Sequence, residues 1–161
     1  MEKLTAIELS QYILAKLGTM SHLKLQKLIY YVEAYHLAYF EESIIDEEFQ
    51  AWVHGPVVRE VWDNYKNLDS PLFDKISLSS DEKKEIVQLV ERRLSEDQLS
   101  LIGDVFEALG STTAYDLERL THQEEPWREA RQGLPIDENC TKTISRETMR
   151  RFYYNEMYSL E

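Results

Sequence analysis

Residues 21–42 read SHLKLQKLIYYVEAYHLAYFEE, and this stretch predicts the longest helix of the chain. Apolar side chains recur at helical spacing from Leu25 to Tyr39, the pattern of an α-helix with a buried stripe. Tyr30 and Tyr31 widen the apolar surface beyond a single stripe. A helix that is apolar on more than one side is usually surrounded by other elements, so we expect this one to lie at the centre of its domain.

Capping patterns on both sides of this stretch mark the ends of further helices. A Ser or Thr followed three residues later by Glu or Gln forms a capping box, which satisfies free backbone N–H groups at a helix start. Such boxes occur at Thr5–Glu8, Ser79–Glu82 and Ser95–Gln98, while Ser21 and Ser145 are predicted N-caps, Pro126 a first helical residue, and Gly18 and Gly110 helix ends. With a short helix over residues 112–120, the chain is expected to hold about seven helices.

The stretch FQAWVHGPVVR, residues 49–59, has a different period. Apolar and polar positions alternate over residues 49–54, which predicts a short strand. Pro56 suits the first position of a helix, and it favours an extended Gly55 before it. We therefore expect a strand that turns sharply into a helix at Gly55–Pro56. A second short strand is predicted at residues 72–76.

The predicted fold class is mainly α, with a small two-stranded β element near residues 49–54 and 72–76. The chain has 161 residues, 43% of them hydrophobic, which suits one compact domain over residues 1–161. No apolar run is long enough to span a bilayer. The N-terminal sequence lacks the apolar core of a secretory signal, and the one cysteine, Cys140, has no disulfide partner within the chain. A cytoplasmic location is the simplest expectation.

The formal net charge of −12 bears on the kind of partner. An acidic surface repels nucleic-acid phosphates, so direct nucleic-acid binding is not expected. The same surface attracts basic proteins and speeds encounter with them. Solubility alone would also account for the charge.

The sequence offers no recognisable catalytic, cofactor-binding or metal-binding residues. Its four histidines, His22, His36, His54 and His122, have no second ligand at a metal-site spacing. Nucleophile-elbow, phosphate-loop and dinucleotide-binding motifs are missing from the 161 residues, which include only five glycines. We therefore expect no enzyme activity and no cofactor.

Aromatic residues near the Gly-Pro pair allow two interpretations. Trp52 and His54 fall on the strand face opposite Phe49 and Ala51. They either pack under a neighbouring helix or form a patch for a partner, because Trp is favoured at binding hot spots. The sequence leaves both interpretations open, and the same applies to Trp127.

Three blocks of the chain resemble the signature of a known family. LKLQKLIYYVEAYHLA (residues 23–38), FQAWVHGPVVREVW (49–62) and DLERLTHQEEPWREAR (116–131) are similar, in this order, to the Panacea domain. This is the SocA-like antitoxin domain, also found in prophage-associated proteins. The first two blocks are the more specific, and the resemblance spans most of the chain.

The resemblance implies an antitoxin that neutralises a cognate toxin by direct protein–protein contact. SocA-type members instead act as adaptors that deliver a toxin to a cytoplasmic AAA+ protease, which is the alternative outcome. Many relatives carry an extra DNA-binding module, and we expect none here. Further alternatives are a phage or prophage protein that binds a host factor, and a small enzyme that uses carboxylates. The predicted partner-contact residues are Trp52, His54, Gly55, Pro56, Arg59, Glu124 and Trp127.

Overall fold

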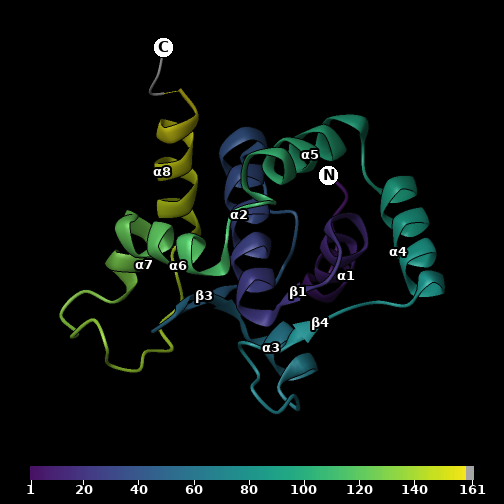
Figure 1. Ribbon diagram of the computed structural model, residues 1–161. Coiled ribbons are helices and arrows are strands. Elements are labelled where there is room, and N and C mark those ends of the chain that lie inside the picture. Colours follow the sequence, from purple (N-terminus) through teal and green to yellow (C-terminus); the bar gives the residue numbers. More distant parts are fainter. Residues whose placement is uncertain (159–161) are drawn as a thin grey trace.

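A computed structural model describes residues 1–158 of the chain. Within these residues, eight helices and four short strands pack around one apolar core (Figure 1). The helices are α1 (Ala6–Leu17), α2 (His22–Phe40), α3 (Arg59–Tyr65), α4 (Ser80–Arg93), α5 (Glu96–Leu109), α6 (Ala114–Gln123), α7 (Glu125–Ala130) and α8 (Arg146–Tyr158). The strands are β1 (Met20–Ser21), β2 (Phe49–Trp52), β3 (Gly55–Val58) and β4 (Lys75–Ile76). The mainly α fold class predicted from the sequence is confirmed.

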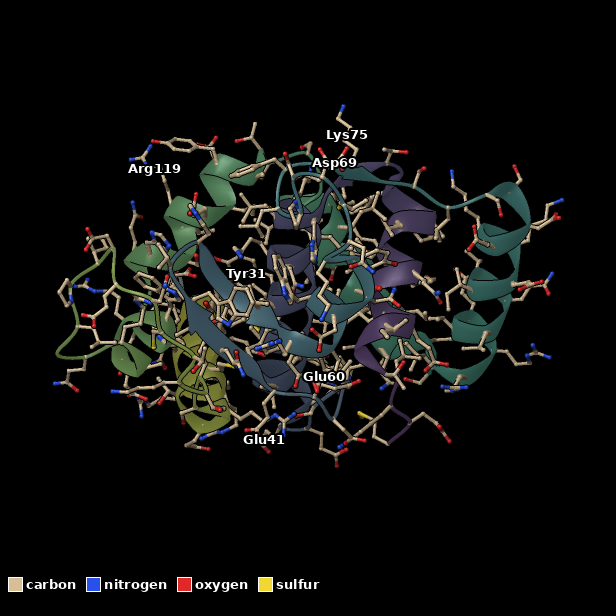
Figure 2. All side chains as sticks on the ribbon, turned by 90° about the horizontal axis from the view of Figure 1, so that it is seen from below. Tyr31, Glu41, Glu60, Asp69, Lys75 and Arg119 are labelled. Atoms are coloured by element: carbon tan, nitrogen blue, oxygen red, sulfur yellow. The ribbon has the colours of Figure 1, made fainter. Side chains whose placement is uncertain are left out.

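Helix α2 is the centre of the molecule, as its apolar pattern predicts. Fifteen of its 19 residues are buried. It contacts α1, α5, α6, α8 and strand β3, which surround it in Figure 1. Figure 2 places Tyr31 of this helix near the middle of the molecule, while Glu41, Asp69 and Arg119 lie at its edge.

The predicted caps are present and explain where the helices begin. Thr5, Ser79 and Ser95 each accept a hydrogen bond from the backbone three residues later, and the Glu or Gln side chain there bonds back to the cap. The Ser21 side chain caps α2 in the same way, with a single bond. Each of the three reciprocal boxes satisfies two N–H groups that the helix itself cannot pair.

The expected strand-to-helix corner at Gly55–Pro56 is wrong. Strands β2 and β3 form an antiparallel hairpin whose two-residue turn is Val53–His54, and Pro56 lies inside β3 opposite Ala51. The N–H of Ala51 points away from β3, to the carbonyl of Lys142, so Ala51 and Pro56 form a pair that needs no hydrogen bond from proline. Gly55 has φ = 104° rather than the extended backbone expected of it. The helix begins three residues after Pro56, at Arg59.

The second predicted strand is present at β4, and it pairs with β1 rather than with the hairpin. Pro126 lies in the first turn of α7, after Glu125 rather than at the first helical position. At α8, Ser145 accepts a bond from the Thr148 backbone as predicted, and Ile144 and Met149 are both buried. None of the helices within residues 1–158 is long and apolar enough to cross a membrane.

Candidate partner-binding site

The β2–β3 hairpin is attached to the central helix by the Gln26 side chain. Its Oε1 accepts a hydrogen bond from the Val58 backbone N–H at 2.9 Å, and its Nε2 lies 3.4 Å from the Val58 carbonyl oxygen. The Gln26 amide thus pairs with the outer edge of β3 much as a neighbouring strand would. Residue Gln26 is fully buried, so water does not compete for these bonds.

Lys27 makes the second attachment from the same helix turn. Its Nζ donates to the Pro56 carbonyl oxygen at 3.0 Å, and the residue is completely buried. Burial lowers the pKa of the Lys27 ammonium to about 7, while the nearby Glu118 carboxylate opposes the shift. A Cβ on Gly55 would lie 2.5 Å from Lys27 Cε, so the lysine reaches its carbonyl only because residue 55 has no side chain.

Helix α7 and the residue after it hold the other strand of the hairpin. The Trp127 indole N–H donates to the Trp52 carbonyl at 2.8 Å, and Arg131 donates to the Ala51 carbonyl at 2.8 Å. The Arg131 guanidinium also lies 4.9 Å from the Trp127 ring centroid. Residues of all three sequence blocks therefore meet at the hairpin and fix its position on α2.

The hairpin has two different faces. Phe49, Ala51 and Val58 are buried in the core, and Phe49 packs edge-on against Tyr30 of α2 with ring centroids 5.2 Å apart. Side chains of residues directly opposite in an antiparallel pair share a face, so Trp52 belongs to the opposite, outer face together with Gln50 and Val57. The Trp52 indole N–H donates to Gln50 Oε1 at 2.7 Å and is thereby fixed in place.

The outer face borders a hollow of about 380 Å³, which we call the Trp hollow. It is lined by Trp52, Val53, His54, Val57, Arg59, Trp62, Leu72 and residues 139–141. The Trp52 and Trp62 rings meet edge to face at 5.1 Å, and the Arg59 guanidinium lies 5.9 Å from the Trp52 ring. Phe73, next to the hollow, is 64% exposed and lies 6.3 Å from the His54 ring.

His54 connects this surface to the buried lysine. Its Nδ1 lies 2.6 Å from Glu118 Oε1. The Glu118 carboxylate in turn favours the charged form of Lys27 and so opposes the lowering of the Lys27 pKa. The His54 side chain is 47% exposed and that of Glu118 only 16%, so the carboxylate lies between an exposed imidazole and a buried ammonium. The turn of the hairpin is thus anchored to α6 by the contact between His54 and Glu118.

Of the seven predicted contact residues, the structure brings three to the rim of the Trp hollow: Trp52, His54 and Arg59. The other four, Gly55, Pro56, Glu124 and Trp127, are buried. Of these four, Trp127 also lines a second hollow beside α7, and a role of the seven residues in partner binding stays a prediction. Sequence reasoning missed Leu72 and Phe73, which come from the connector after α3, although a Phe in a polar connector is a usable signal.

Glu124 is a core residue with a specific role. Its Oε1 accepts hydrogen bonds from the Tyr31 and Tyr153 hydroxyls, at 2.6 and 2.8 Å. Burial raises the pKa of the Glu124 carboxyl to about 7, and the two hydroxyl donors only partly offset this. The carboxyl therefore joins α2 to α8 at the end of α6.

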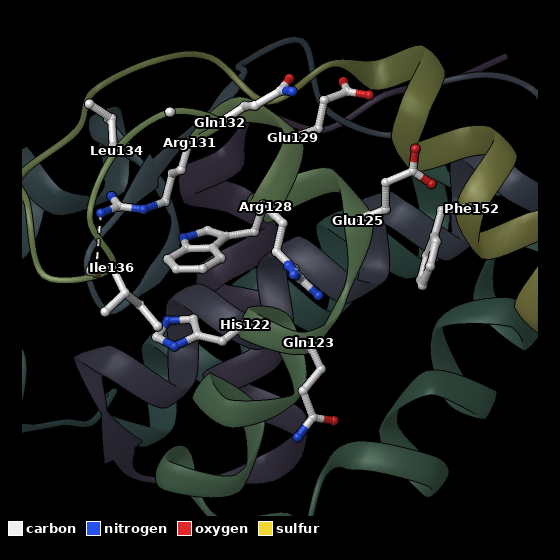
Figure 3. Close-up of a pocket in the computed structure, with 12 residues that line it drawn as sticks. His122, Gln123, Glu125, Arg128, Glu129, Arg131, Gln132, Leu134, Ile136 and Phe152 are labelled. Atoms are coloured by element: carbon white, nitrogen blue, oxygen red, sulfur yellow. Dashed lines mark hydrogen bonds between the residues drawn. The ribbon is translucent and has the colours of Figure 1, made fainter.

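A second hollow, of about 690 Å³, is lined mainly by residues between His122 and Ile136 (Figure 3). His122, Gln123 and Arg128 lie around it, and His122 stacks on Trp127 with centroids 4.0 Å apart. The Arg131 guanidinium at its edge already donates to four backbone carbonyls, of Ala51, Pro135, Ile136 and Glu138. Among residues 1–158, no three His, Cys, Asp or Glu side chains are grouped as metal ligands.

One of the comparisons with known proteins identifies a family. The family model described as "Antitoxin SocA-like, Panacea domain" matches residues 25–128, a range that starts just before Gln26 and Lys27 and ends just after Trp127. No curated protein and no solved structure matches the chain. Because the family model covers more than half of the sequence, the chain belongs to the SocA-like antitoxin, Panacea-domain family.

Proposed function

We propose that this protein is an antitoxin that neutralises a cognate toxin by direct protein–protein binding in the cytoplasm, without catalysis. Membership of the SocA-like family supports an antitoxin role in general. The observation that carries the specific proposal is the Trp hollow, because it presents Trp52, Trp62 and Arg59 together at the surface. Trp and Arg are the residue types most enriched at binding hot spots.

The rigidity of the hairpin supports the same function. Gln26, Lys27, Trp127 and Arg131 all bond to its backbone, so the outer face is held in position before any partner arrives. Binding to a preorganised surface avoids the entropy cost of ordering a loop, about 0.5–1.5 kcal/mol for each immobilised side chain.

The net charge of −12 favours a basic toxin. Opposite net charges raise the association rate, which matters for a protein that must capture its toxin before the toxin acts. Rim charges act mainly on the rate of encounter, whereas buried aromatic contacts act mainly on the lifetime of the complex.

Co-expression with the protein encoded by the neighbouring open reading frame tests the proposal. That protein should arrest growth alone and be harmless together with this chain. Trp52→Ala and Arg59→Ala should each restore toxicity while the thermal melt of the purified variant stays cooperative. Tyr115→Ala is the matched control, because Tyr115 is an aromatic residue 64% exposed on α6 outside the hollow.

The proposal fails if the neighbouring product is harmless alone, or if it stays toxic in the presence of the wild-type chain. Direct neutralisation also predicts that the purified chain inhibits the toxin at a one-to-one ratio without any protease. A toxin that is inhibited only in cells, with a shortened half-life, would indicate delivery to a protease instead.

A further inference from the structure

The segment at residues 142–144 pairs with β2 through one isolated antiparallel bridge. The Ala51 N–H donates to the Lys142 carbonyl at 2.9 Å, and the Ile144 N–H donates to the Phe49 carbonyl at 2.8 Å. Gln50 and Thr143 are therefore the antiparallel pair between these two bonds. The hairpin and this segment together form a three-stranded arrangement, with β2 in the middle.

The bonding pattern sets the direction of the Thr143 backbone. Where the flanking residues bond inward, the N–H and C=O of the residue between them point away from the neighbouring strand. Both backbone groups of Thr143 consequently point outward, and neither has a partner among residues 1–158. Thr141 lies two residues earlier, so in an extended segment its backbone groups point to the same side as those of Thr143. They likewise have no backbone partner within the described chain. Residues 141–143 are all exposed.

The two outer edges of this arrangement differ. The β3 edge is already occupied, since Gln26 bonds to Val58 and Lys27 bonds to Pro56. The edge at residues 141–143 is open, and a row of free backbone donors and acceptors is a template for a further strand. Two of its three residues are threonine, a β-branched type that suits extended backbone.

The open edge is continuous with the Trp hollow. Asn139, Cys140 and Thr141 form one wall of that hollow, so a strand added at the edge would place side chains beside Trp52. Four acidic residues adjoin these segments in sequence, and none forms an ion pair within residues 1–158: Glu48, Glu60, Asp137 and Glu138. The edge itself carries one cation without an ion pair among the described residues, Lys142. The excess of acidic over basic groups, together with the net charge of −12, favours a segment that carries Lys or Arg.

We propose that the cognate toxin binds as an extended segment that adds a strand beside Thr141–Thr143. One apolar side chain of the segment enters the Trp hollow, and flanking basic side chains face these acidic residues. Strand addition draws affinity from backbone hydrogen bonds and specificity from the pocket that receives alternate side chains. This inference rests on the antitoxin function proposed above and names the way in which the toxin is recognised.

Thr143→Pro tests the edge directly. Proline removes the outward N–H and places its ring where the partner backbone would lie, yet it breaks no bond within the chain, because that N–H has no internal partner. Thr143→Val is the matched control, since it keeps the backbone N–H and the β-branched shape. The proline variant should bind the neighbouring-frame protein about tenfold more weakly or worse, and the valine variant within about twofold of wild type.

Amide hydrogen exchange on the wild-type chain gives a second readout that needs no variant. The Thr141 and Thr143 amides should exchange fast in the free protein and at least about tenfold more slowly in the complex, because backbone pairing protects them. Equal binding by the proline and wild-type chains, or unchanged exchange at both amides in the complex, overturns strand addition while the antitoxin function stands.

Other outcomes also decide the question. If the wild-type chain does not bind the toxin at all, the proposed function fails and this inference with it. If both amides become protected in the free protein as its concentration rises, the edge pairs with a second copy of this chain, which overturns its assignment to the toxin.

Discussion

Replacing Gly55 by alanine should destabilise the fold through two separate effects. The first is the backbone: φ at residue 55 is 104°, a region that costs a residue with a side chain about 1–3 kcal/mol. The second is the close contact with α2 and α6, since the new Cβ would lie 2.5 Å from Lys27 Cε and 2.9 Å from Thr121 Oγ1. To relieve the contact, Lys27 must withdraw from the Pro56 carbonyl.

The second effect sets the expected magnitude. Below pH 7 the Lys27 donor is charged, and a buried hydrogen bond from a charged donor contributes about 1.5–3 kcal/mol. Under these conditions Gly55→Ala should lower the free energy of unfolding by about 3–5 kcal/mol in total. Gly133→Ala is the matched control. Residue 133 has a similar φ of 88°, but a Cβ there meets no atom within 4 Å, so only the backbone cost remains.

Urea denaturation followed by circular dichroism measures both free energies. Gly55→Ala should be less stable than Gly133→Ala by about 2 kcal/mol, the part due to Lys27. In a Lys27→Ala background this excess should fall, since the closer of the two contacting side chains is gone and only Thr121 Oγ1 remains. The double-mutant cycle should give a coupling energy of about 1–2 kcal/mol. Equal losses for the two glycine variants, or an excess that is undiminished without Lys27, would refute the reasoning.

Further predictions concern the buried carboxyl, the loop anchor and a helix cap. The folded-state pKa of Glu124, about 7, lies above the unfolded value of 4.5, so ionisation of this carboxyl opposes folding. Glu124→Gln keeps an oxygen for the two tyrosine hydroxyls, and its stability relative to wild type should rise by up to about 3 kcal/mol between pH 4.5 and 7, measured by urea titration at each pH. Arg131→Lys keeps the charge but not the planar fork, so it should cost about 2–4 kcal/mol and speed amide exchange in residues 132–139. Ser79→Ala removes one bond of a capping box and should cost about 1 kcal/mol in a thermal melt, with no effect on toxin binding.

Patterns within a few residues were sufficient to predict most of the helices, although not the start of α3. The Thr5 and Ser95 boxes begin α1 and α5 as expected, because a cap is a bond between residues three positions apart. The central position of α2 followed from its apolar side chains, which cover more than one side of the helix. The fold class and the family were therefore accessible from the sequence.

At the Gly55–Pro56 pair, local sequence patterns do not determine the secondary structure. Glycine followed by proline is compatible with a helix start and also with an edge strand, so propensity alone does not choose between them. The choice was made by side chains about 30 positions away, since Gln26 and Lys27 supply the bonds that keep this backbone extended. No short window contains both partners.

The candidate site likewise depends on contacts between residues far apart in the sequence. The sequence alone determined which residue types were available: a Trp, a His and an Arg close together around residue 55, and no motif of catalysis. Only the tertiary structure decided that Trp52, His54 and Arg59 face outward while Glu124 and Trp127 are enclosed. The physical reason is that helix caps and periodicity depend on bonds between near neighbours, whereas exposure depends on which distant segments cover a side chain.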